Sequence, residues 1–223
     1  MLYALISDIH SNLFALEAAL KEIEKKGAEV ILVAGDICGK GPHHFEVIKI
    51  LSNFASFAVK GNSDIKFISS KQKNTLKQKE KTLIDWLSSL PLMRFIDNQI
   101  LLCHGSPLKT TDYIYPSVTK EGLLRKLGNL DIPRVLAAGH SHIPFIKRVE
   151  NIFVVNGGSV GKPIDGDPRG SYALFEIDGE KVKGKIFRFN YDVGKFISIL
   201  KNMKYSKKTI LSYKEGLKNG RNC

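Results

Sequence analysis

Apolar runs alternate with amphipathic segments through the first half of the chain. The short apolar runs are residues 2–7, 29–36 and 54–62. Apolar residues recur at helical spacing over residues 12–27, 44–53 and 77–89. The short runs have the length of strands and the spaced segments the period of helices. Strands separated by helices of this length predict βαβ units and a mainly parallel sheet.

The second half of the chain is richer in strand patterns. Runs are expected over residues 99–106, 135–142, 145–159 and 171–189, followed by a last helix at about 191–202. The final run contains the turn Asp178-Gly179-Glu180 between two alternating segments, which predicts a β-hairpin. No repeat or low-complexity linker divides the chain. We therefore predict one α/β (α+β) sandwich domain over residues 1–203 and a basic C-terminal tail over 204–223.

The amino-acid composition limits the class of protein and its cellular compartment. The content of 43% hydrophobic and 25% charged residues is ordinary for a soluble globular protein. No apolar run approaches the about 20 residues that cross a bilayer, so we expect no membrane partner. Asp8 interrupts the first apolar run, which we interpret as a strand and not as a signal peptide. Three cysteines, Cys38, Cys103 and Cys223, are too few for a disulfide framework and favour a reducing cytoplasm.

The positive charge is concentrated in two stretches. The net charge is +12, and from residue 195 to the end eight Lys and Arg stand against one Glu, which places +7 in the last 29 residues. A second Lys-rich stretch covers residues 66–81. Neither stretch interleaves aromatic residues with Arg as single-strand binders do. Solvated helix faces and a tail explain the positive charge better than a nucleic-acid-binding arm does. The sequence does not indicate the oligomeric state.

Five of the apolar runs end in a side chain that can bind a metal ion. The residues at these ends are Asp8, His10, Asp36, Asn62, His104, His140 and His142. Four of the six histidines occupy such places. In open α/β sheets, ligands bind at the carboxyl ends of the strands. We therefore expect the seven side chains to converge on one crevice.

The chemical types of these side chains narrow the choice of metal ion. Imidazole, carboxylate and amide oxygen without a thiolate pair suit Mn, Fe, Co, Ni or Zn. Seven ligands are too many for one tetrahedral ion but serve two ions if one carboxylate bridges them. Asp36 is the natural bridge, because it lies between the first pair of ligands and the later ones. Cys38 and Cys103 flank ligands, and we interpret them as buried thiols.

The order of these motifs is similar to that of a known family. Asp-x-His, Gly-Asp, Gly-Asn, His-Gly and Gly-His-x-His resemble the motifs of the calcineurin-like metallophosphoesterases. A Gly-rich stretch, residues 156–170, resembles one in the small bacterial and archaeal phosphodiesterase-like branch, so that the likeness covers about residues 1–190. The resemblance implies a four-layer αββα sandwich of two mixed β-sheets flanked by helices.

The resemblance also implies the ligands of two divalent transition metal ions, with manganese favoured. One ion would be held by Asp8, His10, Asp36 and His142. The other would be held by Asp36, Asn62, His104 and His140. Asn62 and His104 would also bind phosphate.

The expected activity is hydrolysis of a small phosphoester by a hydroxide that bridges the two ions. One alternative is a non-catalytic interaction scaffold of the same fold, like the retromer subunit that resembles this family. Such a scaffold would be expected to lose ligands, whereas all seven are present. The other alternative is a nuclease that uses the basic tail.

The sequence departs from the family pattern at Ser63. Many protein-phosphatase relatives have a His here that protonates the leaving group, and a Ser hydroxyl is too weakly acidic for that role. Asp64 matches the acidic residue that supports this His, so its function here is open. His43 or His44 could donate a proton or bind phosphate instead, with a surface position at a helix start as the alternative. Arg169 and backbone N–H groups of residues 156–170 could bind phosphate. A loop between strands is the better explanation for residues 162–166, whereas residues 157–159 are expected to line the site or support the sheet.

Overall fold

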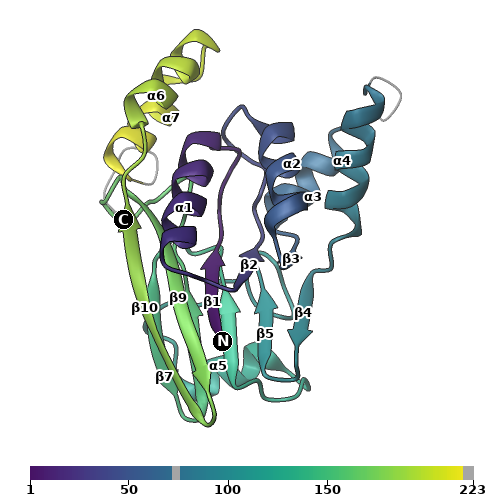
Figure 1. Cartoon of the computed structure of the whole chain (residues 1–223), viewed down its shortest axis with the longest axis vertical. Coiled ribbons are helices and arrows are strands. Elements are labelled where there is room, and N and C mark those ends of the chain that lie inside the picture. Colours follow the sequence, from purple (N-terminus) through teal and green to yellow (C-terminus); the bar gives the residue numbers. More distant parts are fainter. Residues whose placement is uncertain (72–75, 218–223) are drawn as a thin grey trace.

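The structure is a computed structural model that describes residues 1–71 and 76–217. Ten strands form two five-stranded sheets over these residues (Figure 1). In order across the first sheet, the strands are β10 (Lys181–Phe189), β9 (Gly170–Asp178), β1 (Leu2–Ile6), β2 (Val30–Ala34) and β3 (Phe57–Val59). Across the second they are β4 (Met93–Ile96), β5 (Ile100–Cys103), β6 (Val135–Ala138), β8 (Ile152–Asn156) and β7 (Phe145–Val149).

Each sheet has three adjacent parallel strands with antiparallel strands beside them. β1, β2 and β3 are parallel, and so are β5, β6 and β8. The predicted hairpin is β9–β10, which pairs antiparallel from Gly170 to Asp178. In the described residues the helices are α1 (Leu13–Lys25), α2 (His44–Phe54), α3 (Asn62–Ser69), α4 (Gln78–Ser89), α5 (Lys120–Leu127), α6 (Val193–Asn202) and α7 (Lys207–Glu215). Helices α1 and α2 connect the parallel strands β1, β2 and β3, as βαβ units require.

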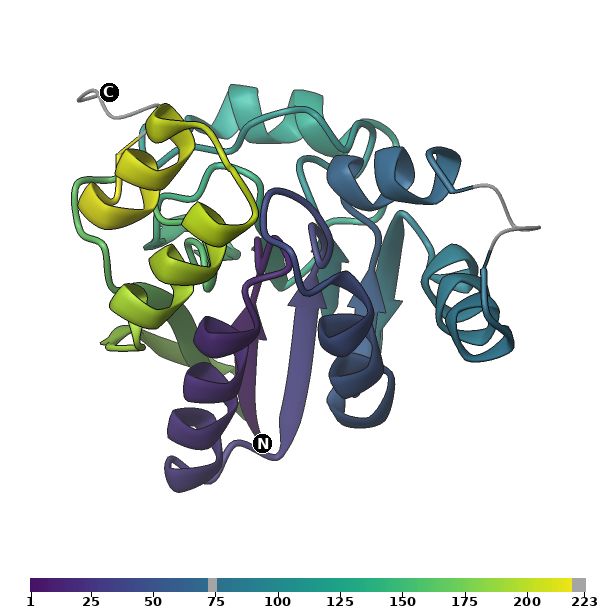
Figure 2. The same cartoon turned by 90° about the horizontal axis from the view of Figure 1, so that it is seen from above.

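The alternation of side chains along each strand builds the layers. Tyr3 and Leu5 of β1 are buried between the two sheets, whereas Ala4 and Ile6 pack with the helices of the first sheet. On the outer face of the second sheet, Leu136 of β6 packs in one cluster with Leu123 and other residues of α5. Figure 2 shows α1 and α2 on one side of the strands and α5 on the other. The four-layer αββα sandwich is therefore confirmed.

Several elements in the described residues differ from the expectation. β4 and α5 were not predicted, because each is short. The Gly61–Asp64 segment, for which no helix was predicted, begins helix α3. The reason is that the Asp64 carboxylate accepts the Gly61 N–H at 2.8 Å and caps the first turn.

The expected C-terminal tail contains helix α7. Its Tyr213 is fully buried against Phe196 of α6, with ring centroids 5.0 Å apart. The lysines of α7 obscured this apolar side in the sequence. Residues 218–223 of the expected tail, and residues 72–75 of the Lys-rich stretch, lie outside the described residues. Over the described part of the chain, no helix has both the length and the apolar character to cross a membrane.

Tyr213 offers a test of how firmly α7 is held. Its hydroxyl is buried and has no hydrogen-bond partner in the structure. Tyr213→Ala should lower the free energy of unfolding by about 3 kcal/mol, because the ring leaves a cavity beside Phe196. Tyr213→Phe is the matched control and should be at least as stable as the wild type, since it removes only an unpaired polar group. Urea unfolding measures both, and a Phe variant as unstable as the Ala variant would contradict this packing.

Candidate metal centre

The metal-competent side chains lie at the carboxyl ends of five strands. Asp8 follows β1, Asp36 follows β2 and Asn62 opens α3 after β3. His104 follows β5 in the second sheet, and His140 and His142 follow β6. The facing sheets bring these ends together, so the structure gathers all seven side chains that the sequence singled out.

Five of the seven residues have a left-handed backbone. Their φ angles are 54° at Asp8, 49° at His10, 51° at Asp36, 65° at His140 and 56° at His142. This conformation costs an L-residue about 1–2 kcal/mol. Hydrogen bonds between the loops hold it: the Asp8 N–H donates to the Gly35 carbonyl and the His10 N–H to the Asp36 carbonyl, each at 3.0 Å. Strain that neighbouring contacts maintain in this way is typical of functional sites.

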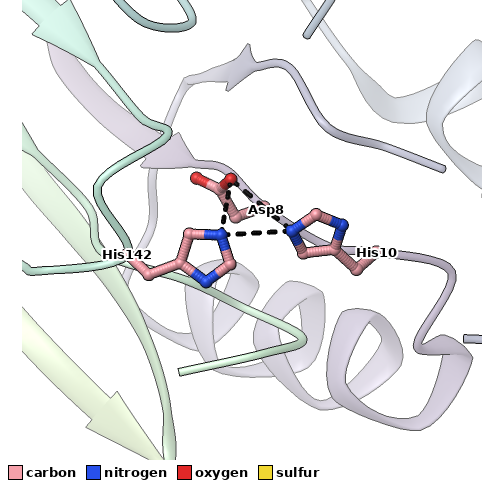
Figure 3. A group of neighbouring side chains, drawn as sticks. All are labelled: Asp8, His10 and His142. Carbon is pink, nitrogen blue, oxygen red and sulfur yellow. Dashed lines mark hydrogen bonds and ion pairs between the residues drawn. The ribbon is translucent and has the colours of Figure 1, made fainter. Parts of the chain in front are cut away.

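Asp8, His10 and His142 form the first group (Figure 3). His142 Nε2 lies 3.1 Å from both His10 Nε2 and Asp8 Oδ1. His142 Nδ1 donates to the Lys162 carbonyl at 2.5 Å, so a neutral ring has its lone pair on Nε2. Burial lowers the pKa of His10 to about 4, and Asp8 Oδ1 is buried without accepting a hydrogen bond. The lone pairs of His142 Nε2 and Asp8 Oδ1 thus face each other beside His10 Nε2, an arrangement that a cation stabilises.

The second group contains Asp36, His104 and His140, with Asn62 beside it. His104 Nδ1 donates to the Ala34 carbonyl at 2.7 Å, which leaves Nε2 as an acceptor in the neutral ring. That atom lies 3.1 Å from Asn62 Oδ1 and from His140 Nδ1, and 3.3 Å from Asp36 Oδ1. Only the contact with His140 can be a hydrogen bond of a neutral His104. The contacts with Asn62 and Asp36 each bring two hydrogen-bond acceptors together.

Asp36 faces both groups. Its Oδ1 belongs to the contact with His104, and its Oδ2 lies 3.7 Å from His10 Nε2. Ser63 fixes this carboxylate, since its N–H donates to Oδ1 at 2.8 Å and its hydroxyl to Oδ2 at 2.6 Å. The sequence alone gave Ser63 no such role.

The donor atoms fit divalent ions of the first transition row. They are imidazole nitrogens, carboxylate oxygens and one amide oxygen, the set that the sequence predicted. Cys38 and Cys103 are buried and belong to neither group. Burial raises the pKa of the Cys103 thiol to about 12, which disfavours a thiolate.

A cleft of about 400 Å³ opens over the two groups. Besides five of the candidate ligands, its lining includes Ser63, Lys40, Lys162, Tyr113 and Tyr115. The sequence analysis missed the two lysines and the two tyrosines. No period or motif marks them, because loop conformation alone brings them to the cleft.

Four weaker candidates do not line the cleft: Asp64, His43, His44 and Arg169. The buried Asp64 carboxylate accepts the Cys38 N–H at 2.7 Å and the Gly61 N–H at 2.8 Å, and so ties the loops after β2 and β3 together. Burial and the Asp36 charge raise its pKa to about 7. The His43 ring lies 5.7 Å from that of Phe14.

The exposed Arg169 is engaged by Asp167, with Nη2 and Oδ2 2.7 Å apart. His44, which follows His43 in the sequence, also lies outside the cleft lining. Its Nδ1 is 2.6 Å from the Ser11 hydroxyl, and its ring centroid is 4.5 Å from that of Phe67.

Gly61 provides a local test of the centre. Its φ of −95° suits any residue, but a Cβ there would collide with the Asp36 carboxylate. Gly61→Ala should therefore displace Asp36 and weaken Mn²⁺ binding by about tenfold or more. Gly194→Ala, in helix α6 with only ordinary contacts, is the matched control. Calorimetric titration of both folded variants measures the effect, and equal Mn²⁺ affinity in the two would refute the collision.

Comparison with known proteins agrees with this geometry. The family model for the calcineurin-like phosphoesterase superfamily domain matches residues 1–180. An uncharacterized protein of Methanocaldococcus jannaschii is 30% identical, over 89% of this chain and 92% of its own. Phosphodiesterase YfcE of Escherichia coli K12 is 26% identical, over 77% and 85%. The crystal structure of a metallophosphoesterase from Sphaerobacter thermophilus superposes with a TM-score of 0.82 at 26% identity, over 97% and 99%. The chain belongs to the calcineurin-like phosphoesterase superfamily.

Proposed function

We propose that the protein is a phosphodiesterase that uses two divalent metal ions to hydrolyse a small phosphodiester to a phosphomonoester and an alcohol. The observation that carries this proposal is the pair of acceptor groups that share Asp36 at the floor of one cleft. We assign Asp8, His10, Asp36 and His142 to one ion. We assign Asp36, Asn62, His104 and His140 to the other. Manganese is the proposed metal.

Bound ions would supply two things: a water of lowered pKa as nucleophile, and positive charge that offsets the developing charge on the phosphoryl oxygens. The chain's own residues prepare the site for this. The carbonyls of Ala34 and Lys162 hold two of the imidazoles in the tautomer that has a lone pair on Nε2. Ser63 holds Asp36, and Lys40 and Lys162 add positive charge to the cleft that receives an anionic substrate.

We propose that the substrate is a diester with a good leaving group, because the candidate proton donors are not available to protonate a poor one. The Ser63 hydroxyl already donates to Asp36, and neither His43 nor Asp64 lines the cleft. None of these candidates can protonate a departing alkoxide. The phosphodiesterase named among the relatives supports the same choice.

The alternatives have less support. A scaffold without activity does not require two complete acceptor groups under an open cleft. A nuclease arm requires a free basic tail, whereas Tyr213 in the described part of that segment is buried against α6. We also propose a cytoplasmic location, supported by the buried free thiols of Cys38 and Cys103.

Metal dependence is the first test. Hydrolysis of bis-p-nitrophenyl phosphate should cease after treatment with a strong chelator and return on addition of Mn²⁺. Asp36→Asn should lower kcat/KM by about 100-fold or more, because it weakens both metal groups. Asp131→Asn, at an exposed carboxylate away from the cleft, is the control. Turnover that survives the chelator would refute the proposal.

Leaving-group dependence is the second test. Across methyl aryl phosphates, kcat/KM should fall by about 10²–10⁴-fold from the p-nitrophenyl to the phenyl ester, since neither Ser63, His43 nor Asp64 is placed to protonate the poorer leaving group. Ser63→Ala should lower Mn²⁺ affinity and leave this ratio unchanged. A ratio near one for the wild type, measured by steady-state kinetics, would show that a general acid acts.

A further inference from the structure

A row of aromatic rings lies against one of the proposed metal ligands. Tyr113 stacks on His140 with ring centroids 4.4 Å apart and an angle of 26° between the planes. Tyr115 stacks in turn on Tyr113 at 5.3 Å and 8°. The contact with His140 explains why one tyrosine is present. It does not explain the second ring, which is 41% exposed beside a polar cleft.

The loop that carries the two tyrosines is braced. It runs from His104 toward helix α5, and Ser106 and Lys109 exchange backbone hydrogen bonds of 3.0 and 3.2 Å within it. Asp112 accepts the Tyr113 N–H at 3.0 Å and forms an ion pair of 2.7 Å with Lys126 of α5. A Cβ at Gly105 would collide with the carbonyls of this loop, so the loop is compact. The rings are therefore held before any substrate arrives, which lowers the entropic cost of binding.

The cleft has different chemistry at its two ends. The tyrosines lie beside His140, in the group that also contains Asp36 and His104. Lys162 lies beside the other group, because its carbonyl accepts a hydrogen bond from His142 and its charge acts on the rings of His10 and His142. One end thus offers aromatic surface and the other offers positive charge. This polarity fits a substrate with a planar ring on one side of its phosphate.

We propose that Tyr113 and Tyr115 bind a planar aromatic group of the substrate by stacking, and that the natural substrates are phosphodiesters that carry such a group. The inference rests on the proposed function, since the phosphate must lie over the metal groups. A nucleobase and a simple aryl ring share the required chemistry. Stacking of a base on a tyrosine is worth about 1–3 kcal/mol.

The test compares diesters with one leaving group and different second groups. The p-nitrophenyl esters of thymidine 5′-phosphate, phenyl phosphate and methyl phosphate release the same product, so differences among them report the second group. Tyr115→Leu should lower the preference for the thymidine ester over the methyl ester, expressed as the ratio of kcat/KM values, about tenfold. Tyr115→Phe, which keeps a ring, should retain the preference. Leu108→Ala, at an exposed residue of the same loop outside the cleft lining, controls for disturbance of the loop.

The outcomes distinguish a nucleobase from a simple aryl ring as the bound group. They also distinguish failure of the stacking site from failure of the proposed function. An equal loss of preference for thymidine and phenyl esters supports a general aromatic site, and a loss confined to thymidine supports a nucleobase site. An unchanged ratio in Tyr115→Leu would overturn the proposal. If the wild type hydrolyses none of the three esters with Mn²⁺, the proposed function fails. Calorimetric titration with thymidine 5′-phosphate still tests the stacking then, and equal affinity of wild type and Tyr115→Leu would overturn it.

Discussion

The site depends on the convergence of hydrogen-bond acceptors at the ends of two facing sheets. In the first group the Nε2 atoms of His10 and His142 are 3.1 Å apart beside a buried carboxylate oxygen that accepts no hydrogen bond. The lone pairs of His142 Nε2 and Asp8 Oδ1 repel each other, and bringing such atoms out of water is costly. A positive ion between them reverses the sign of the interaction. The left-handed residues after β1, β2 and β6 impose this geometry. The folded chain therefore carries an electrostatic repulsion that a bound cation would remove.

Contacts behind the candidate ligands hold them in this arrangement. Ser63 holds Asp36, and two backbone carbonyls orient His104 and His142. Asp64 ties the loops after β2 and β3 without facing the cleft. Asn12 caps α1 through Ala15 and donates to the Gly161 carbonyl at 2.9 Å, which links the first loop to the Gly-rich stretch. Such support usually matters for metal affinity nearly as much as the ligands themselves.

The sequence predicted which side chains converge, because their positions follow from regular structure. A polar residue at the end of a buried parallel strand must lie at the carboxyl edge of the sheet, which placed Asp8, Asp36 and His104 without knowledge of any loop. Tyr113 and Lys162 escaped prediction, because irregular backbone brings them to the cleft and no spacing rule governs it. Helix α7 escaped because its three lysines obscure a short apolar side, on which Tyr213 and Ile210 dock against α6.

The number of metal ions per chain tests the central claim most directly. The purified protein, loaded with Mn²⁺ and freed of excess metal, should contain two ions per chain by elemental analysis. His142→Ala and His104→Ala should each contain one, since each removes a ligand of a different group, and the double variant should contain none. One ion in the wild type, or two retained in either single variant, would contradict the account.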